Sequence, residues 1–517
     1  MIGTKAPQSV ARIAMVANAE IRYFLIDLAR LLKDRHGSRI HLYCNTDQDV
    51  RFYRDRDPDG VFASIERARR IVDPVEEPTA EADADLAKAR YYEQLLGLTY
   101  NTLAVGNRHF GRGYALAGFY HPRSRYSEQS TYGQMVRSYN AVFAYWERVF
   151  ADRDVTLVLG GSSECGHIAA AKGIPFRQMK GSRTRNLHYW ATDVYGHNPA
   201  IERAFQACAA SQEQDAGAVL DQPYDLANTL REEFVRGNNV FGLLGRLGHH
   251  ALRRTYWRLR GYEKAKGYYA LDELRFMVRH WTDTRRMLAP RTERFAEIRG
   301  KPYVFYALGT EPETALGVSS PEFFFQHAAI AALSRDLPAG YLLAVKETMH
   351  GVGRRPANFY DQIGELKNVV WLDMIESGLE VARHATAVAV ITSTVGFEAA
   401  ILGTPVISFG RHNLYNFLPH VHAVTDLGKQ GSSVRAALDP AFDRTKAKRD
   451  GSRFLHAVVE TSFDMGDYDY VDFQRYDPAT VERAGRALLG SLSRGLDPVT
   501  TARAAGGTPA SERETAQ

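Results

Sequence analysis

One pattern recurs along the chain: a short apolar run, a turn of small residues, a helix-like segment and a second apolar run. It occurs at residues 11–44, 154–179 and 390–410. A strand, a helix and a second strand within roughly 35 residues form a βαβ unit, and such units build parallel sheets with right-handed crossovers. The recurrence therefore predicts an α/β protein of doubly wound, Rossmann-like sheets.

The length of the chain and the change from strand–helix alternation to long helical segments predict how these units are divided into domains. The 517 residues are too many for one compact core, which favours two domains that face a cleft. Strand and helix alternate in both halves, with long Arg-, Tyr- and Trp-rich helical segments between them. We predict an N-terminal Rossmann-like domain over 1–197, a helical insertion or hinge over 198–299, a C-terminal Rossmann-like domain over 300–496 and a disordered tail over 497–517.

Composition excludes several classes of function. A net charge of +5 with scattered basic residues does not indicate a nucleic-acid partner. The three cysteines, Cys44, Cys165 and Cys208, contain no CxxC pair, which fits neither a zinc site nor a disulfide framework and favours a reducing cytoplasm. We expect no metal, because no convincing DxD pair follows a strand. Neither a secretory leader nor an apolar stretch of about 20 residues is recognisable.

The third repeat carries the best candidate for a ligand site. Ser393 and Thr394 follow a predicted strand directly and precede a helix, so their hydroxyls and backbone N–H groups meet the positive end of the helix dipole. Gly396 would let a ligand approach closely. Glu398 lies in an otherwise apolar helix and is expected either to accept hydrogen bonds from a sugar or ribose diol or to favour the helix N-terminus. The turn predicts a phosphate-binding site.

Charged residues after two neighbouring strands extend this prediction. Lys346, His350, Arg354 and Arg355 place four potential cations on one strand-end loop, which suits a phosphate leaving group; a solvated basic loop is the alternative. Glu311 and Glu313 follow the strand that begins at Tyr303. They are candidates for a general base or for binding sugar hydroxyls, and a polar loop is the alternative.

The N-terminal half offers a second rim of polar residues. Ser162 and Glu164 follow a strand at the same topological position as the phosphate turn, and Arg183 follows the next strand. Glu20 comes after the first strand. We predict that these residues share one rim of the cleft, although structural roles fit each of them individually.

The motifs of the C-terminal half resemble a known family. ST-x-G-x-EA at 393–399, LG-x-PVI-x-FG at 402–410 and YALGTEPET at 306–314 are similar, in order and spacing, to the capsule polysaccharide biosynthesis family, which includes bacterial Kdo (3-deoxy-manno-octulosonic acid) transferases. The resemblance covers about 303–415. It implies a GT-B-like fold and a nucleotide-sugar donor, such as a CMP-activated acidic sugar, in the C-terminal domain. The family reads Lys-Glu-His-Pro where this chain has Lys-Glu-Thr-Met.

These observations together predict a metal-independent GT-B glycosyltransferase of bacterial capsule or surface polysaccharide synthesis. Its partners would be a nucleotide sugar, which is a substrate rather than a cofactor, and a glycan or lipid-linked acceptor. The resemblance to GT-B enzymes implies that the acceptor binds at the N-terminal rim of Glu20, Ser162, Glu164 and Arg183. The alternatives are a non-hydrolysing sugar-nucleotide epimerase and a catalytically degenerate module of polysaccharide assembly, which the Thr-Met departure keeps open.

The insertion contains one further unusual stretch, HHALRRTYWRLRGYEKAKGYY, at 249–269. Its interleaved arginines and aromatics predict peripheral contact with the anionic inner face of the membrane. Stacking on single-stranded nucleic acid is a second interpretation, and helices that pack aromatics inward and arginines outward are the third.

Overall fold

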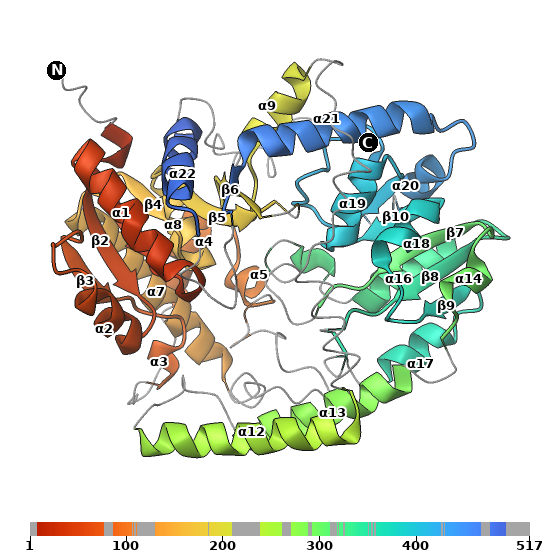
Figure 1. Cartoon of the computed structure of the whole chain (residues 1–517), viewed down its shortest axis with the longest axis horizontal. Helices are drawn as coiled ribbons and strands as arrows, with labels where there is room; N and C mark the ends of the chain where they lie inside the picture. Colours follow the sequence, from red (N-terminus) through yellow and green to blue (C-terminus); the bar gives the residue numbers. More distant parts are fainter. Residues whose placement is uncertain are drawn as a thin grey trace, which may run out of the picture.

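The computed structural model contains two α/β domains side by side, with a helical segment below them in the view of Figure 1. The residues that the structure describes are 8–76, 86–105, 107, 110, 130–182, 184, 186–208, 238–260, 270–287, 292–310, 318, 320–323, 326–349, 351–352, 355, 358–424, 426, 428, 430–466 and 476–492.

The N-terminal domain is built on a seven-stranded sheet with the order β13-β6-β5-β4-β1-β2-β3. The five strands from β5 to β3 are parallel and follow the order of a Rossmann sheet, whereas β6 and β13 are antiparallel additions at one edge. The strands are β1 (Arg12–Val16), β2 (Arg39–Cys44), β3 (Ser64–Arg67), β4 (Leu157–Leu159), β5 (Phe176–Gly181), β6 (Leu187–Ala191) and β13 (Phe463–Asp464). The helices that accompany them are α1 (Arg22–His36), α2 (Asp47–Asp55), α3 (Asp73–Glu76), α4 (Leu86–Leu96), α5 (Tyr100–Val105), α7 (Tyr132–Asp152) and α8 (Ser163–Ala171).

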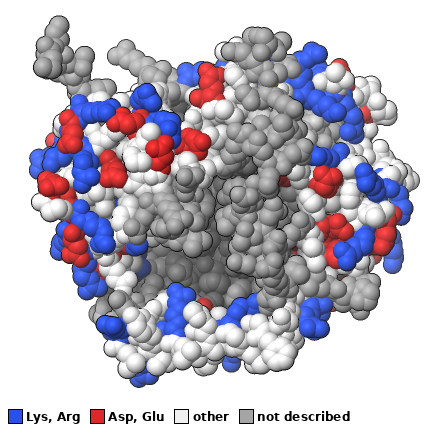
Figure 2. Space-filling model, in the orientation of Figure 1, with Lys and Arg blue, Asp and Glu red and all other residues white. Residues whose placement is uncertain are grey.

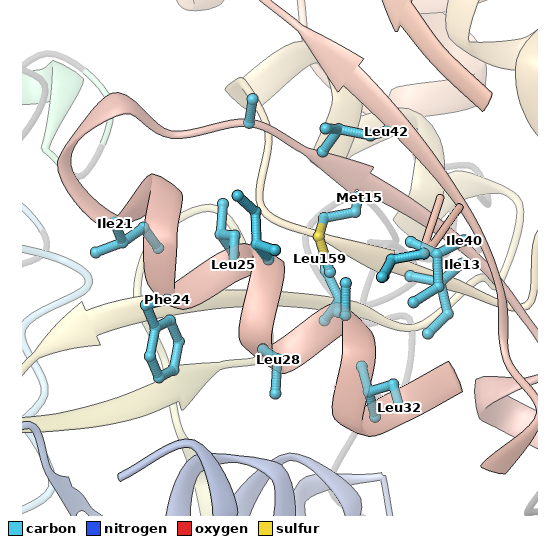
Figure 3. Packing of buried hydrophobic residues seen from close by; sticks show 14 of the residues in the cluster. Ile13, Met15, Ile21, Phe24, Leu25, Leu28, Leu32, Ile40, Leu42 and Leu159 are labelled. Atoms are coloured by element: carbon cyan, nitrogen blue, oxygen red, sulfur yellow. The ribbon is translucent and has the colours of Figure 1, made fainter. Parts of the chain in front are cut away.

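The alternating side chains of β1 show why this sheet needs helices on both faces. Ile13 and Met15 are buried in one hydrophobic cluster, and Ala14 and Val16 in another. Successive side chains of a strand point to opposite faces, so a strand that is apolar throughout is stable only when both faces are covered. Figure 3 shows α1 on the first of these faces, and α1 ends at Gly37 in a left-handed conformation, φ 62°.

The C-terminal domain repeats the same architecture. Its six strands are all parallel and have the order β9-β8-β7-β10-β11-β12, which is the 3-2-1-4-5-6 order of a Rossmann sheet. They are β7 (Tyr303–Ala307), β8 (Leu342–Lys346), β9 (Val369–Leu372), β10 (Ala387–Val390), β11 (Val406–Ser408) and β12 (Val421–Ala423). The helices are α14 (Phe295–Ile298), α16 (Gln326–Asp336), α17 (Phe359–Gly364), α18 (Gly378–His384), α19 (Thr394–Leu402), α20 (Gln430–Ala437) and α21 (Arg444–Thr461). The prediction of two doubly wound, Rossmann-like domains is confirmed.

The chain crosses between the domains more than once, which corrects the predicted boundary at 496. Helix α9 (Pro199–Ala207) packs on α21, and its Ile201 is buried in the core of the C-terminal domain. After α21 the chain returns: β13 joins the N-terminal sheet, and α22 (Pro478–Ser491) packs on α1. Val481 and Leu488 are fully part of the N-terminal core. The described residues 463–466 and 476–492 therefore belong to the N-terminal domain, because their apolar side chains are buried there.

The insertion contributes two long helices, α12 (Val240–Leu259) and α13 (Ala270–Met287), which pack on each other along the lower edge of Figure 1. Helix α13 contacts the C-terminal domain, where Arg279 Nη2 donates to the carbonyl oxygen of Arg355 at 2.9 Å. None of the helices in the described ranges combines the length and apolarity needed to cross a membrane. The predicted tail at 497–517 lies outside the described residues.

Candidate functional site

The topology of the C-terminal sheet points to one position for a ligand. The strand order reverses between β7 and β10, and ligands of open parallel sheets bind beyond the carboxyl ends of the strands at such a switch point. The turn after β10 holds Ser393 and leads directly into α19. The sequence-predicted phosphate turn therefore lies at the switch point of its sheet.

Ser393 is the N-cap of α19, yet its side chain does not cap the helix. Its backbone is extended (φ −77°, ψ 155°), as an N-cap requires, but the hydroxyl makes no capping hydrogen bond. The Oγ atom is buried and has no hydrogen-bond partner among the described residues. A buried hydroxyl without a partner is costly, and together with the N-terminal N–H groups of α19 it is suited to binding an anion.

Two other residues of this helix have different surroundings from those predicted. Gly396 is buried, and a Cβ there would lie 2.2 Å from the Tyr415 hydroxyl and 2.5 Å from Val390 Cγ2. The glycine thus makes room for protein packing rather than for a ligand, which corrects its predicted role. Glu398 is half-buried in the second turn of α19.

The loop after β11 folds over the end of β10 and is held there by asparagines. Asn413 Nδ2 donates to the carbonyl oxygen of Ile391 at 2.6 Å and to Ser408 Oγ at 2.9 Å. Asn416 Nδ2 donates to the carbonyl oxygen of Gly410 at 2.7 Å. This loop presents His412 toward the N-terminal domain.

A cluster of polar rings joins the two domains beside this loop. Asp193, which follows β6, accepts hydrogen bonds from the backbone N–H groups of Tyr195, Gly196 and His197 at 3.0 to 3.1 Å. Its other oxygen lies 2.6 Å from His197 Nδ1, and His197 Nε2 lies 3.2 Å from His412 Nδ1. Tyr195 stacks on His412 with ring centroids 4.0 Å apart and planes 11° apart.

A cavity of about 110 Å³ lies between this cluster and the N-terminus of α19. The N-terminal domain lines it with residues that include Ser182, Tyr195 and Gly196, and the C-terminal domain with residues that include Ser393 and His412. The cavity thus joins the phosphate turn of one domain to the β5–β6 edge of the other. A larger cavity of about 1230 Å³ lies between α13 and α17, and its lining shares no residue with the interdomain cavity.

The electrostatics of the cluster keep one histidine neutral. Burial, together with the smaller effects of His197 and Arg411, lowers the pKa of His412 to about 4 against the opposing effect of Asp193. Burial would raise the pKa of Asp193, but hydrogen bonds from His197 and from the backbone lower it. At neutral pH a charged carboxylate therefore orients His197, and a neutral His412 is available for hydrogen bonding.

The cluster predicts a pH dependence of stability. Because the pKa of His412 is 6.5 in the unfolded chain and about 4 in the folded one, only the unfolded chain binds a proton between these values. The free energy of unfolding should therefore fall as the pH drops through this window. In His412→Gln this contribution is absent, so the difference in melting temperature between wild type and variant should narrow from about pH 7 to about pH 5. A constant difference across that range would contradict the burial of a neutral imidazole.

The strand-end loop after β8 is organised differently from the prediction. Arg355 and Glu347 form a buried ion pair, with side chains 1% and 0% exposed and Nη2–Oε1 and Nε–Oε2 distances of 2.6 and 2.8 Å. Arg355 also donates to the carbonyl oxygen of Gly309. Its predicted role in donor binding is corrected to holding the loop, because the guanidinium faces protein. Lys346 is half-buried at the end of β8.

The remaining predicted residues fall into two groups. Ser162 caps α8 by accepting a hydrogen bond from the Cys165 N–H at 3.4 Å; Glu164 is buried in the first turn of that helix, and Glu20 is exposed after β1. These three lie at the switch point between β1 and β4. The others, Arg183, Glu311, Glu313, His350 and Arg354, lie outside the described residues.

No family model and no curated protein matches the chain. Solved structures similar to it include CalG4, the calicheamicin glycosyltransferase (13% identity, 93% of this chain and 99% of that one, TM-score 0.28). A second is sucrose-phosphate synthase from Thermosynechococcus elongatus (11% identity, 93% of this chain and 98% of that one, TM-score 0.28). A third is UDP-GlcNAc 2-epimerase from Neisseria meningitidis bound to UDP-GlcNAc (10% identity, 87% of this chain and 99% of that one, TM-score 0.23). TM-scores this low do not place the chain in any of these groups. The class follows from the topology: an α/β protein of two Rossmann-like domains with a cavity between them.

Proposed function

We propose that the protein is a metal-independent glycosyltransferase of the GT-B type. It would bind a nucleotide sugar through the C-terminal domain and transfer the sugar to an acceptor on the N-terminal domain. The observation that supports this most is the N-terminus of α19. There Ser393, whose buried hydroxyl has no hydrogen-bond partner among the described residues, lines a cavity that the other domain closes. A donor phosphate held there would lie at the junction where an acceptor can reach it.

Within this proposal, Ser393 and Thr394 bind the donor phosphate and Glu398 binds hydroxyls of the donor. Lys346, with His350 and Arg354 as predicted from the sequence, neutralises the leaving group. Glu311 and Glu313 remain the sequence-predicted candidates for the general base. His412 is too weakly basic for that role, since its pKa is about 4, and we assign it to hydrogen-bonding an oxygen of the substrate.

The acceptor and setting also follow the resemblance to the capsule family. We propose a glycan or glycolipid acceptor of bacterial capsule or surface polysaccharide, bound near Glu20, Ser162, Glu164 and Arg183. The donor would be a CMP-activated acidic sugar such as Kdo. The enzyme would work in the cytoplasm at the inner face of the membrane, with no cofactor and no nucleic-acid partner.

The hydroxyl of Ser393 provides a sharp test of donor binding. In Ser393→Ala we expect the affinity for the preferred nucleotide to fall about tenfold or more, the loss of one hydrogen bond to a charged group. The melting temperature should not fall, because this hydroxyl makes no capping hydrogen bond. Calorimetric titration would follow a thermal-shift screen of CMP, CDP, UDP, GDP and their sugar conjugates.

Ser377→Ala is the matched control. Ser377 is the N-cap of α18, and its hydroxyl accepts a hydrogen bond from the Glu380 N–H. Its loss should cost about 0.5–2 kcal/mol of stability and leave nucleotide affinity unchanged. If none of the nucleotides binds the wild type, or if Ser393→Ala binds as tightly, the turn is not a donor site.

Product analysis separates the alternatives. An epimerase would convert the bound nucleotide sugar in the absence of any acceptor, whereas a transferase needs the acceptor for turnover. A degenerate assembly module would bind without turning over in either case.

A further inference from the structure

Helix α12 exposes an apolar stripe along its outer side. Phe241, Leu252 and Leu259 are 80%, 74% and 81% exposed, and Leu244 and Tyr256 are more than half exposed. With 3.6 residues per turn, Phe241, Leu252 and Leu259 fall on one side of the helix. Leu243 and His250 fall on the opposite side, are buried, and pack toward α13. The helix is therefore held on its inner side, where His250 and Arg254 pair with Glu273 of α13, and presents an apolar stripe to solvent.

The charges on this helix have a single sign. The sequence of α12, VFGLLGRLGHHALRRTYWRL, contains no aspartate or glutamate. Arg253 and Arg260 lie along one flank of the stripe and Arg258 along the other, all exposed, whereas Arg254 turns inward to Glu273 at 3.3 Å. In Figure 2 the lower edge of the molecule, where α12 lies, shows white and blue side chains.

We propose that the stripe Phe241–Leu259 of α12 docks on an anionic lipid bilayer. The helix would lie in the plane of the interface, with its leucines and Phe241 among the acyl chains and its flanking arginines at the phosphate groups. Charge complementarity selects this occupant: arginines border both sides of a stripe about 27 Å long, and no carboxylate of α12 opposes the surface charge of the lipid.

The stripe bears on the three interpretations of the stretch 249–269, of which 261–269 lie outside the described residues. Helices that pack aromatics inward do not account for Tyr256 or for Leu252 and Leu259, which are exposed beside the arginines. The inference deepens the proposed function, because it assigns a surface to the membrane contact. The inference rests on the proposed function only for the lipid-linked acceptor. Vesicle binding needs neither donor nor acceptor, so a failure to bind vesicles can be distinguished from a failure of the transferase proposal.

The test is sedimentation of the full chain with vesicles of phosphatidylglycerol and phosphatidylcholine, compared with pure phosphatidylcholine vesicles. We expect binding to the anionic vesicles that weakens at high salt, and much weaker binding to the neutral ones. The pair Leu252→Ser and Leu259→Ser should lower the partition coefficient at least about tenfold. The pair Arg253→Gln and Arg258→Gln should lower it about fivefold per charge on anionic vesicles only.

Two exposed residues on other helices serve as controls. Tyr132→Ser on α7, where the side chain is 61% exposed, and Arg51→Gln on α2 should leave vesicle binding unchanged. Equal melting temperatures show that the variants fold. The proposal is overturned if the wild type does not bind anionic vesicles, or if both α12 variants bind them as well as the wild type. It is also overturned if light scattering shows that the wild type is a dimer and the leucine variant a monomer.

Discussion

Arg355→Ala will destabilise the protein by about 3–5 kcal/mol, the largest effect we expect from any single truncation of a charged side chain. The substitution leaves the Glu347 carboxylate buried at 0% exposure without its guanidinium partner. Tyr360 would still donate to Glu347 Oε2 at 2.9 Å and the Thr348 N–H to Oε1 at 2.7 Å, but neither supplies a positive charge. The melting temperature should fall by on the order of 10 °C in a thermal unfolding experiment.

Two further variants decide why stability is lost. The double substitution Glu347→Leu with Arg355→Met should cost less than Arg355→Ala alone, because no uncompensated charge remains. Arg335→Ala removes an exposed arginine that pairs with Asp336 and should have little effect. If Arg355→Ala instead keeps its stability and loses nucleotide affinity, then Arg355 binds the donor, as its place among four sequence-predicted cations first suggested.

The sheets could be predicted from the sequence because their signals are local. Continuous apolar runs such as 303–307 and 387–390 are typical of strands in a parallel sheet that helices cover on both faces. The position of the turn predicted to bind phosphate, between β10 and α19, could be predicted for the same reason. The carboxyl end of a parallel strand and the N-terminus of the next helix are neighbours in sequence as well as in space.

The interdomain cluster could not be predicted, because it joins loops that are far apart in the chain. His197 and His412 are separated by 215 residues, and nothing near either of them specifies the other. The D-x-x-x-H spacing of Asp193 and His197 was the only local signal. The return of 463–492 to the N-terminal sheet was missed for a similar reason: a short strand and an amphipathic helix fit the apolar edge of either domain.

For two residues, burial in the structure corrects the role that the sequence predicted. Arg355 looks like a phosphate ligand by its loop, and Gly396 looks like a ligand contact by its turn. Only the structure shows that Arg355 forms an ion pair with Glu347 and that Tyr415 occupies the space beside Gly396. Charge and small size in a sequence do not reveal which neighbour uses them.

Gly451→Ala should cost about 3 kcal/mol or more, because it separates the two helices that fix the candidate site in place. A Cβ at Gly451 of α21 would lie 2.1 Å from the carbonyl oxygen of Ile401 and 2.7 Å from that of Ala400, both backbone atoms of α19. Backbone cannot turn aside as a side chain can, so one helix must shift. Since Ser393 lies at the other end of α19, nucleotide affinity of the folded protein should fall together with the melting temperature.

Gly245→Ala in α12 is the matched helix substitution, since nothing lies within 4 Å of its added methyl group. It should be neutral or stabilise by about 0.5–1 kcal/mol, as alanine does at an unobstructed helix position. If Gly451→Ala and Gly245→Ala both change the stability only slightly, the backbones of α19 and α21 are not in contact at Gly451. A loss of stability in Gly451→Ala with unchanged nucleotide affinity would mean that α19 is held by its sheet, and that the packing of α21 does not set the position of the phosphate turn.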